Sequence, residues 1–113
     1  MVLQFLRGRF GRYVDRSQGY SVRLTYRNYP GMYARYVEGP RTMNVFGEVM
    51  ANGKDWHLDS RGITEHWEEP YDSELLDEAR RRLVLDRIIT ALGHMGHRVW
   101  LWDRVTKSWT PPT

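Results

Sequence analysis

The spacing of apolar positions predicts one long helix in the second half of the chain. Val84, Ile88, Ala91, Leu92 and Met95 recur at helical intervals and form a single apolar stripe. The residues just before this stripe are nearly all charged. We therefore expect the C-terminal half of the helix to be its buried half.

Both ends of this helix carry sequence signals. Asp72 and Ser73 offer side-chain oxygens to the first unpaired amides, which predicts a helix over residues 73–95. Gly96 can adopt the left-handed conformation that ends a helix. Residues 97–102 then alternate as in a strand, so the helix is expected to lie across the sheet that contains this strand.

Earlier in the chain, alternating apolar and polar residues predict antiparallel hairpins. Turns are indicated by Gly19, by Pro30-Gly31, by Gly39-Pro40 and by Asn52-Gly53. The predicted strands cover residues 20–27, 33–37, 42–48 and 55–58, with a short addition at 63–67. The expected fold class is α+β, with an antiparallel sheet of about five strands packed on one long C-terminal helix and followed by a final strand.

Length and composition indicate one domain over residues 1–113. Residues 1–12 are expected to be either a mobile basic arm or an edge strand, and residues 104–113 a loose tail. The absence of cysteine excludes disulfides and thiolate sites, which fits a cytoplasmic protein. Apolar runs are too short for a signal peptide core or a membrane span, so no membrane contact is expected.

Charge is distributed unevenly along the chain. Residues 1–41 contain eight arginines and only two carboxylates, whereas residues 59–78 contain eight carboxylates and one arginine. The net charge of +3 conceals this asymmetry. A basic region favours an anionic partner and an acidic region a basic one, so both kinds of partner remain open.

Four histidines raise the question of a metal site. His94 and His97 are three residues apart, and His57 and His66 are the other candidates. Gly96 is expected to end the helix between the first two, and no carboxylate pattern completes a ligand set. We therefore expect neither a metal nor a cofactor, and without a catalytic motif we do not expect an enzyme.

The N-terminal segment interleaves guanidinium groups with aromatic rings. Arg7, Arg9, Phe10, Arg12 and Tyr13 are the ingredients of single-stranded nucleic-acid binding, in which phosphates pair with arginines and bases stack on rings. A solvated basic arm or an arginine-lined edge strand explains the same pattern. Nucleic-acid binding is therefore the alternative function.

Trp100 and Trp102 are expected to point away from the side of the strand that faces the helix. Two exposed indoles would form a contact patch for a partner or for a second copy of the chain, so the protein is expected to be a monomer or a homodimer. The other explanation is that the N-terminal segment or the tail, with Trp109, covers them.

Several short motifs occur in a distinctive order between residues 33 and 102. The most specific is Trp67-Glu68-x-Pro70, which acidic residues and an arginine-rich helix follow. In this order the chain resembles bacterial immunity protein 74, a family encoded beside toxins of polymorphic contact-dependent systems. The motifs that carry the resemblance are residues 36–42, residues 46–50, Ile63, residues 66–70, Glu74 and the helix from Asp77 to Gly96, before a closing apolar strand.

This resemblance implies a small non-catalytic protein that binds a cognate toxin. The charge pattern is compatible with such a role, because an acidic segment speeds the capture of a basic partner. The expected partner contacts are Glu65, Trp67, Glu68, Glu69, Tyr71, Asp72 and Glu74. For Trp67 a place in the core below this segment is the competing interpretation.

Overall fold

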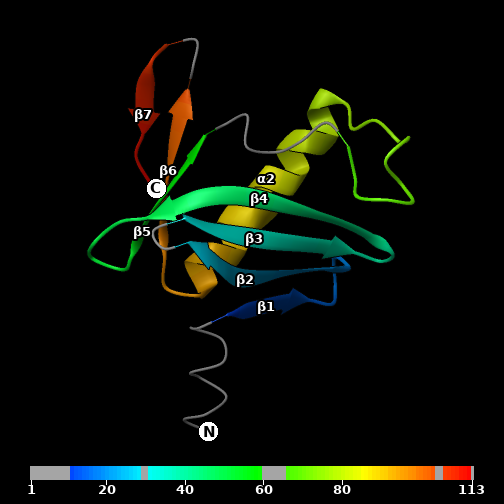
Figure 1. Ribbon diagram of the computed structural model, residues 1–113, viewed down its shortest axis with the longest axis horizontal. Helices are drawn as coiled ribbons and strands as arrows, with labels where there is room; N and C mark the ends of the chain where they lie inside the picture. The colour runs from blue at the N-terminus through cyan, green and yellow to red at the C-terminus, as the bar shows by residue number, and fades with distance from the viewer. Residues whose placement is uncertain (1–10, 29–30, 60–65, 104–105, 113) are drawn as a thin grey trace, which may run out of the picture.

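The computed structural model describes residues 11–28, 31–59, 66–103 and 106–112, and these form one sheet with a helix across it (Figure 1). This agrees with the predicted α+β class, although the sheet has seven strands instead of about five and a final one. The elements are β1 (Arg12–Asp15), β2 (Tyr20–Asn28), β3 (Gly31–Glu38), β4 (Arg41–Val49), β5 (Asp55–Asp59), α2 (Glu78–His94), β6 (Arg98–Asp103) and β7 (Ser108–Thr110).

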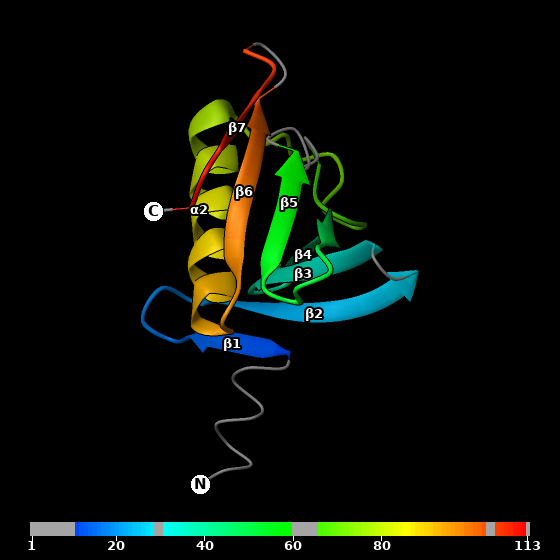
Figure 2. The same ribbon diagram turned by 90° about the vertical axis from the view of Figure 1, so that its left-hand side faces the viewer.

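The strands lie in the sheet in their sequence order, β1 to β7. Strands β2 to β5 form the predicted antiparallel hairpins and β1 extends them at one edge, but β6 pairs with β5 in parallel, with Trp56 opposite Val99. The parallel pair arises because α2 carries the chain back along the sheet before β6 begins. Figure 2 shows that β5 and β6 run across the direction of β2 to β4, so the sheet curls around the helix.

The helix packs its predicted apolar stripe into the concave face of this sheet. Val84, Ile88, Ala91 and Leu92 are fully buried, as expected. Alternate residues of β2 to β5 complete the core from the side of the sheet, and Tyr36 and Trp56 are the largest of them. The buried residues from both layers form one hydrophobic core, and alternation along each strand leaves the other side chains on the outer face.

Gly47 in β4 lets the largest core side chain approach the backbone. A Cβ atom at this position would lie 2.5 Å from Cδ2 of Leu58 and 2.9 Å from the indole of Trp56. Both contacts come from β5, the next strand of the sheet. The absence of a side chain at position 47 is therefore a packing requirement.

The predicted start of the helix is wrong by about one turn. The structure places the N-cap at Asp77, whose carboxylate accepts a hydrogen bond from the backbone N–H of Arg80 at 2.7 Å. Asp72 and Ser73 lie in a loop outside the helix. The chain stays non-helical here because Leu76 is buried in the core while Glu74 is held by an arginine of β4.

The predicted end of the helix at Gly96 is confirmed. Gly96 has φ of 90°, and the backbone N–H of His97 donates to the carbonyl of Leu92 at 2.9 Å. The N–H of Gly96 donates to the carbonyl of Gly93 at 3.0 Å. These two bonds form a Schellman motif, which satisfies carbonyl groups that the last helical turn leaves open.

Most of the predicted arm, residues 1–10, lies outside the described residues, and Arg12 at its end begins β1. In the predicted tail, residues 108–110 form β7, which pairs with β6. The predicted strand at 63–67 falls partly outside the described residues, and His66 forms a single bridge with Leu75. Within the described part of the chain, no helix is long and apolar enough to cross a membrane.

The position of the helix cap can be tested by comparing two aspartates. Replacing Asp77 with alanine removes the acceptor for the Arg80 amide, so we expect the free energy of unfolding to fall by roughly 0.5–2 kcal/mol. The matched change Asp72→Ala should leave it nearly unaltered. Urea denaturation of both variants measures this, and a larger loss at Asp72 would contradict the cap assignment.

A pair of glycines tests the packing of β4 against β5. Gly47→Ala forces a methyl group against Trp56 and Leu58, so we expect a loss of roughly 1–3 kcal/mol in unfolding free energy. Gly93→Ala, where a Cβ would meet no atom within 4 Å, should add about 0.5–1 kcal/mol because alanine favours the helix. Equal thermal stabilities for the two variants would refute this account.

Candidate protein-interaction surface

The acidic loop, residues 66–77, covers the end of the β3–β4 hairpin and leads into α2. Its two ends are anchored in the core, since Trp67 is only 5% exposed and Leu76 only 6%. The ring of Trp67 stacks on Tyr36 at a centroid distance of 6.2 Å. The backbone N–H of Glu68 also donates to the carbonyl of Thr42 at 2.9 Å. The loop is therefore fixed to the sheet at both ends.

Glu68 serves as a bridge from the loop to the outer face of the sheet. Its carboxylate lies 3.2 Å from Nη1 of Arg35 and accepts a hydrogen bond from the hydroxyl of Thr42. The amide of Asn44 donates to the same group at 3.4 Å. Because these contacts occupy both oxygens, this glutamate holds the loop and offers little to a partner.

Glu74 forms the second bridge. Its carboxylate accepts from Nε and Nη2 of Arg41 at 2.6 and 2.8 Å, a bidentate geometry. The guanidinium also lies over the ring of Tyr71, 4.6 Å from its centroid. The hydrogen bonds from Arg41 are the largest cause that lowers the pKa of Glu74 below its usual value.

The loop leaves a different set of groups exposed. Glu69 and Asp72 are exposed as expected, and between them and the helix stands Leu75, which is 73% exposed. Sequence reasoning missed Leu75 because it assigned this position to the helix. Two adjacent leucines, Leu75 and Leu76, in a polar segment could have indicated this, because only one of two neighbouring side chains can reach the core. Glu65 lies outside the described residues.

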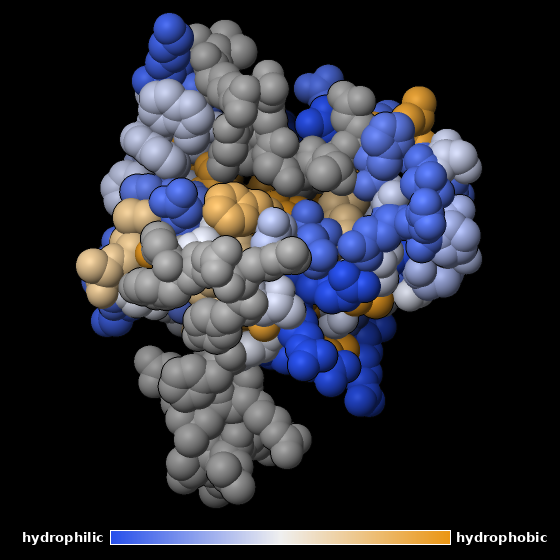
Figure 3. All heavy atoms as spheres, viewed as in Figure 1, coloured by the Kyte–Doolittle hydropathy of each residue, from blue (hydrophilic) through white to orange (hydrophobic). Residues whose placement is uncertain are grey.

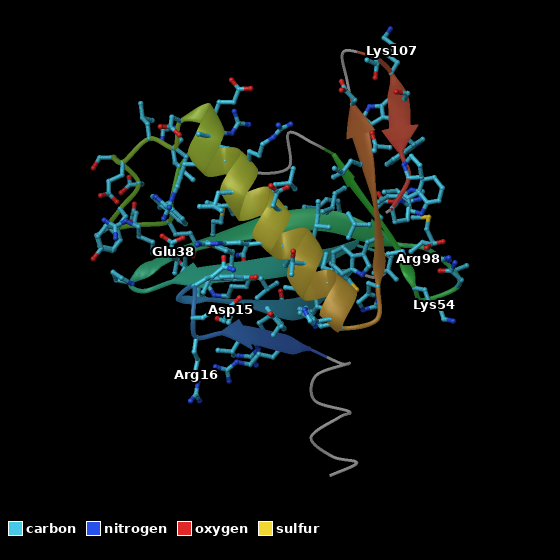
Figure 4. The ribbon with its side chains drawn as sticks, turned by 180° about the vertical axis from the view of Figure 1, so that it is seen from behind. Asp15, Arg16, Glu38, Lys54, Arg98 and Lys107 are labelled. Atoms are coloured by element: carbon cyan, nitrogen blue, oxygen red, sulfur yellow. The ribbon has the colours of Figure 1, made fainter. Side chains whose placement is uncertain are left out.

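A cluster of charged groups, which we call the clamp, fixes the start of the helix beside the acidic loop. Glu38, at the end of β3, accepts hydrogen bonds from Arg80 and Arg87 of α2 and from the hydroxyl of Tyr36. Arg87 also donates to that hydroxyl at 2.8 Å, and burial raises the pKa of Tyr36. Figure 4, seen from behind, shows Glu38 beside the first turns of the helix.

The two predicted patch tryptophans do point away from the helix, but they are partly covered. Trp109 of β7 lies 5.2 Å from the ring of Trp102, and His57 lies 4.4 Å from that of Trp109 and 6.3 Å from that of Trp100. The tail therefore supplies part of the cover. Trp109 itself remains 42% exposed, so an aromatic surface persists at this edge of the sheet.

The predicted nucleic-acid residues separate to opposite faces. Arg12 is exposed on the outer face of β1, whereas Tyr13 faces inward and stacks on His94 at 4.6 Å. Arg7, Arg9 and Phe10 lie outside the described residues. The two described members of this group therefore cannot contact one ligand together.

The four histidines have separate surroundings. His94 stacks on Tyr13, Nδ1 of His66 lies 3.0 Å from the carbonyl of Asp72, and His97 packs edge-on against Trp56, where burial lowers its pKa. Among the described residues, no group of three metal-ligating side chains comes together.

The fold and these surfaces define the chain as a small α+β protein with an anchored acidic loop on one side of a curled sheet. Comparisons with protein-family models, with curated proteins and with solved structures gave no match to this chain.

The electrostatic anchor of the loop can be tested by titration. Glu74 has a lowered pKa in the folded protein, so its stabilising pair with Arg41 is fully present above the usual pKa of a glutamate and is lost as pH falls through the lowered value. We expect Arg41→Ala to return the pKa of Glu74 to its ordinary value, as followed by the NMR shift of its carboxyl carbon. Arg35→Ala should leave that pKa low, and a similar effect of both changes would contradict the assignment.

Proposed function

We propose that this chain is a non-catalytic protein-binding module whose acidic loop captures a basic partner. The observation that carries the proposal is Leu75, an apolar side chain that is 73% exposed on a loop fixed at both ends. Exposed acidic residues surround it in sequence, namely Glu69, Asp72, Asp77 and Glu78. An apolar anchor within a charged rim is the usual composition of an interaction site.

The internal contacts of the loop favour tight binding for a physical reason. A flexible loop loses conformational freedom when a partner binds, and this loss subtracts from affinity. Here Glu68 and Glu74 already hold the loop on β3 and β4 before any partner arrives. Trp67 and Tyr71 are expected from the sequence to contact the partner, but their rings pack against the rest of the protein. We therefore propose Leu75 as the apolar side chain that contacts the partner.

The carboxylates and Leu75 would act on different steps of binding. Exposed carboxylates attract a basic surface over distances of about 8 Å at physiological ionic strength and so raise the association rate. Burial of a leucine side chain contributes roughly 1.5–3 kcal/mol, which slows dissociation. The acidic loop therefore combines attraction with retention.

The class of partner follows from the sequence resemblance to bacterial immunity protein 74. The motif Trp67-Glu68-x-Pro70 and Glu74, which contribute to that resemblance, lie within the acidic loop. On this basis we propose that the partner is a cognate bacterial toxin with a basic surface and that the protein acts in the cytoplasm. The immunity role rests on the resemblance alone, whereas the binding surface rests on the loop geometry.

The proposal predicts distinct kinetic effects for two kinds of substitution. With a toxin encoded by a neighbouring gene as the ligand, Leu75→Ala should weaken affinity by about tenfold or more, mainly through faster dissociation. Glu69→Lys combined with Asp72→Lys should slow association and reduce its dependence on salt. Surface plasmon resonance on the purified full chain measures both rates.

Thr90→Ala is the matched control, because Thr90 is exposed on α2 away from the loop. Its rate constants should equal those of the unaltered protein. A toxin complex with rates that neither loop variant changes would refute the acidic-loop site. A neighbouring toxin that does not bind the unaltered chain would refute the immunity role.

A further inference from the structure

The outer face of the sheet carries three arginines in register on adjacent strands. Arg12 of β1 lies opposite Arg23 of β2, and Arg23 lies opposite Arg35 of β3. We call these three residues the arginine row. No acidic residue occupies an adjacent position on this face of β1 to β3, where the neighbours are Val14, Ser21, Thr25, Tyr33 and Val37.

This arrangement is costly without a ligand. Like charges directly opposite each other destabilise a strand pair, and here two such pairs follow one another. Glu68 neutralises Arg35 from the acidic loop, at 3.2 Å. Among the described residues, Arg12 and Arg23 have no carboxylate partner, and Arg23 stands between the two other cations. The row is therefore suited to binding an anion.

A row of aromatic side chains runs beside the arginine row on the same face. Tyr33 is two residues from Arg35 along β3, about 7 Å away at the usual rise of a strand. It meets Phe46 of β4 edge-on at 5.5 Å, and Phe46 is 46% exposed. In Figure 3, which views this outer face, hydrophobic surface lies between strongly hydrophilic residues.

A second group of rings lies toward the other edge of the sheet, beyond Glu48 of β4, which pairs with His57 of β5. Trp102 and Trp109 lie opposite each other on β6 and β7, with their rings 5.2 Å apart on the outer face. His57 of β5 packs against Trp109. The face thus presents cations over β1 to β3, rings on β3 and β4, and a second group of rings over β5 to β7, with Glu48 between the two groups.

We propose that this outer face binds single-stranded nucleic acid. A single strand presents the complementary pattern, a line of phosphates beside a line of unpaired bases with exposed ring faces. The phosphates would contact the arginine row and the bases would stack on the aromatic row beginning at Tyr33 and Phe46. Paired bases keep their faces inside the helix, so the rings select an unpaired strand.

This surface is separate from the part of the acidic loop proposed to bind a protein. It also differs from the segment suggested by the sequence, with which it shares only Arg12, because the other contacts, Arg23, Tyr33 and Phe46, come from β2 to β4. An acidic polypeptide would share the attraction to the arginines but would gain no stacking on Phe46. The effect of removing the Phe46 ring therefore distinguishes single-stranded nucleic acid from an acidic polypeptide.

The test measures binding of fluorescent oligonucleotides of about 12 nucleotides, one of deoxyuridine and one of uridine, to the full chain at several salt concentrations. Arg23→Gln should weaken binding and reduce the slope of log affinity against log salt by about 0.7, the value for one lost phosphate contact. Phe46→Ala should weaken binding roughly tenfold to a hundredfold and leave the slope unchanged. Comparison of the two oligonucleotides shows whether the 2′-hydroxyl contributes.

Two control variants test the effect of losing a positive charge elsewhere and of altering the acidic loop. Arg82→Gln removes one exposed arginine from α2 and should change binding little, as should Leu75→Ala in the acidic loop. Without ligand, Arg23→Gln should raise the melting temperature because it relieves repulsion within the row. A normal melting transition for Phe46→Ala confirms that the fold is intact.

Three outcomes would overturn the proposal. One is failure of both oligonucleotides to bind at low salt, and another is an equal loss of binding in Arg82→Gln and Arg23→Gln. The third is displacement of the oligonucleotides by poly-glutamate at the same concentration of charge, since this would assign the face to an acidic protein. Arg7 and Arg9 remain in every variant, so differences between variants report on the sheet face.

Discussion

The packing of the helix on the sheet depends on the carboxylate of Glu38. Helix α2 has an apolar stripe from Val84 onward, and Val84, Ile88 and Leu92 fill the concave face of the sheet. The helical residues before Val84 are rich in arginine and have little to bury. Hydrogen bonds to Glu38 from Arg80, in this first part, and from Arg87, in the middle of the helix, hold the helix against β3. A largely buried carboxylate is stable only with such partners, so the clamp and the helix position require each other.

Strand β3 connects this clamp with both candidate binding surfaces. Its inward residues include Tyr36, whose ring supports Trp67 at the base of the acidic loop and whose hydroxyl donates to Glu38. Its outward residues include Tyr33 and Arg35, which belong to the aromatic and arginine rows. The alternation of a single strand therefore assigns one set of side chains to the fold and the other to the surface.

The sequence predicts a turn or a helix end correctly where one local signal determines it. It does not do so where contacts between several elements determine the structure. Gly19 and Gly53 lie in turns that the sequence indicates and have positive φ, and Gly96 adopts the left-handed conformation expected at the end of the helix. The start of α2 was mispredicted because Asp72 and Asp77 are equally good caps in isolation. Tertiary contacts select Asp77, since Leu76 enters the core and Glu74 binds Arg41.

The surface features needed register information that periodicity does not contain. Residues 12, 23 and 35 are far apart in sequence, and only the pairing of β1 to β3 makes them neighbours. Strand β7 was assigned to the tail because its three residues precede two prolines. The acidic loop was recognised as charged, but the division between supporting and exposed residues depends on β4, which supplies Arg41 and Thr42.

The acidic loop and the arginine row carry opposite charge within a molecule whose longest extent is 41 Å. The Debye length is about 8 Å at physiological ionic strength, so each surface presents its own field to an approaching partner, and the net charge describes neither. In the part of the chain that the structure describes, the two surfaces meet where Glu68 contacts Arg35, and that pair neutralises both groups at the boundary. Glu68 thereby anchors the acidic loop and ends the arginine row, leaving Arg12 and Arg23 as its uncompensated charges. This one contact therefore marks the boundary between the acidic loop and the arginine row of the sheet.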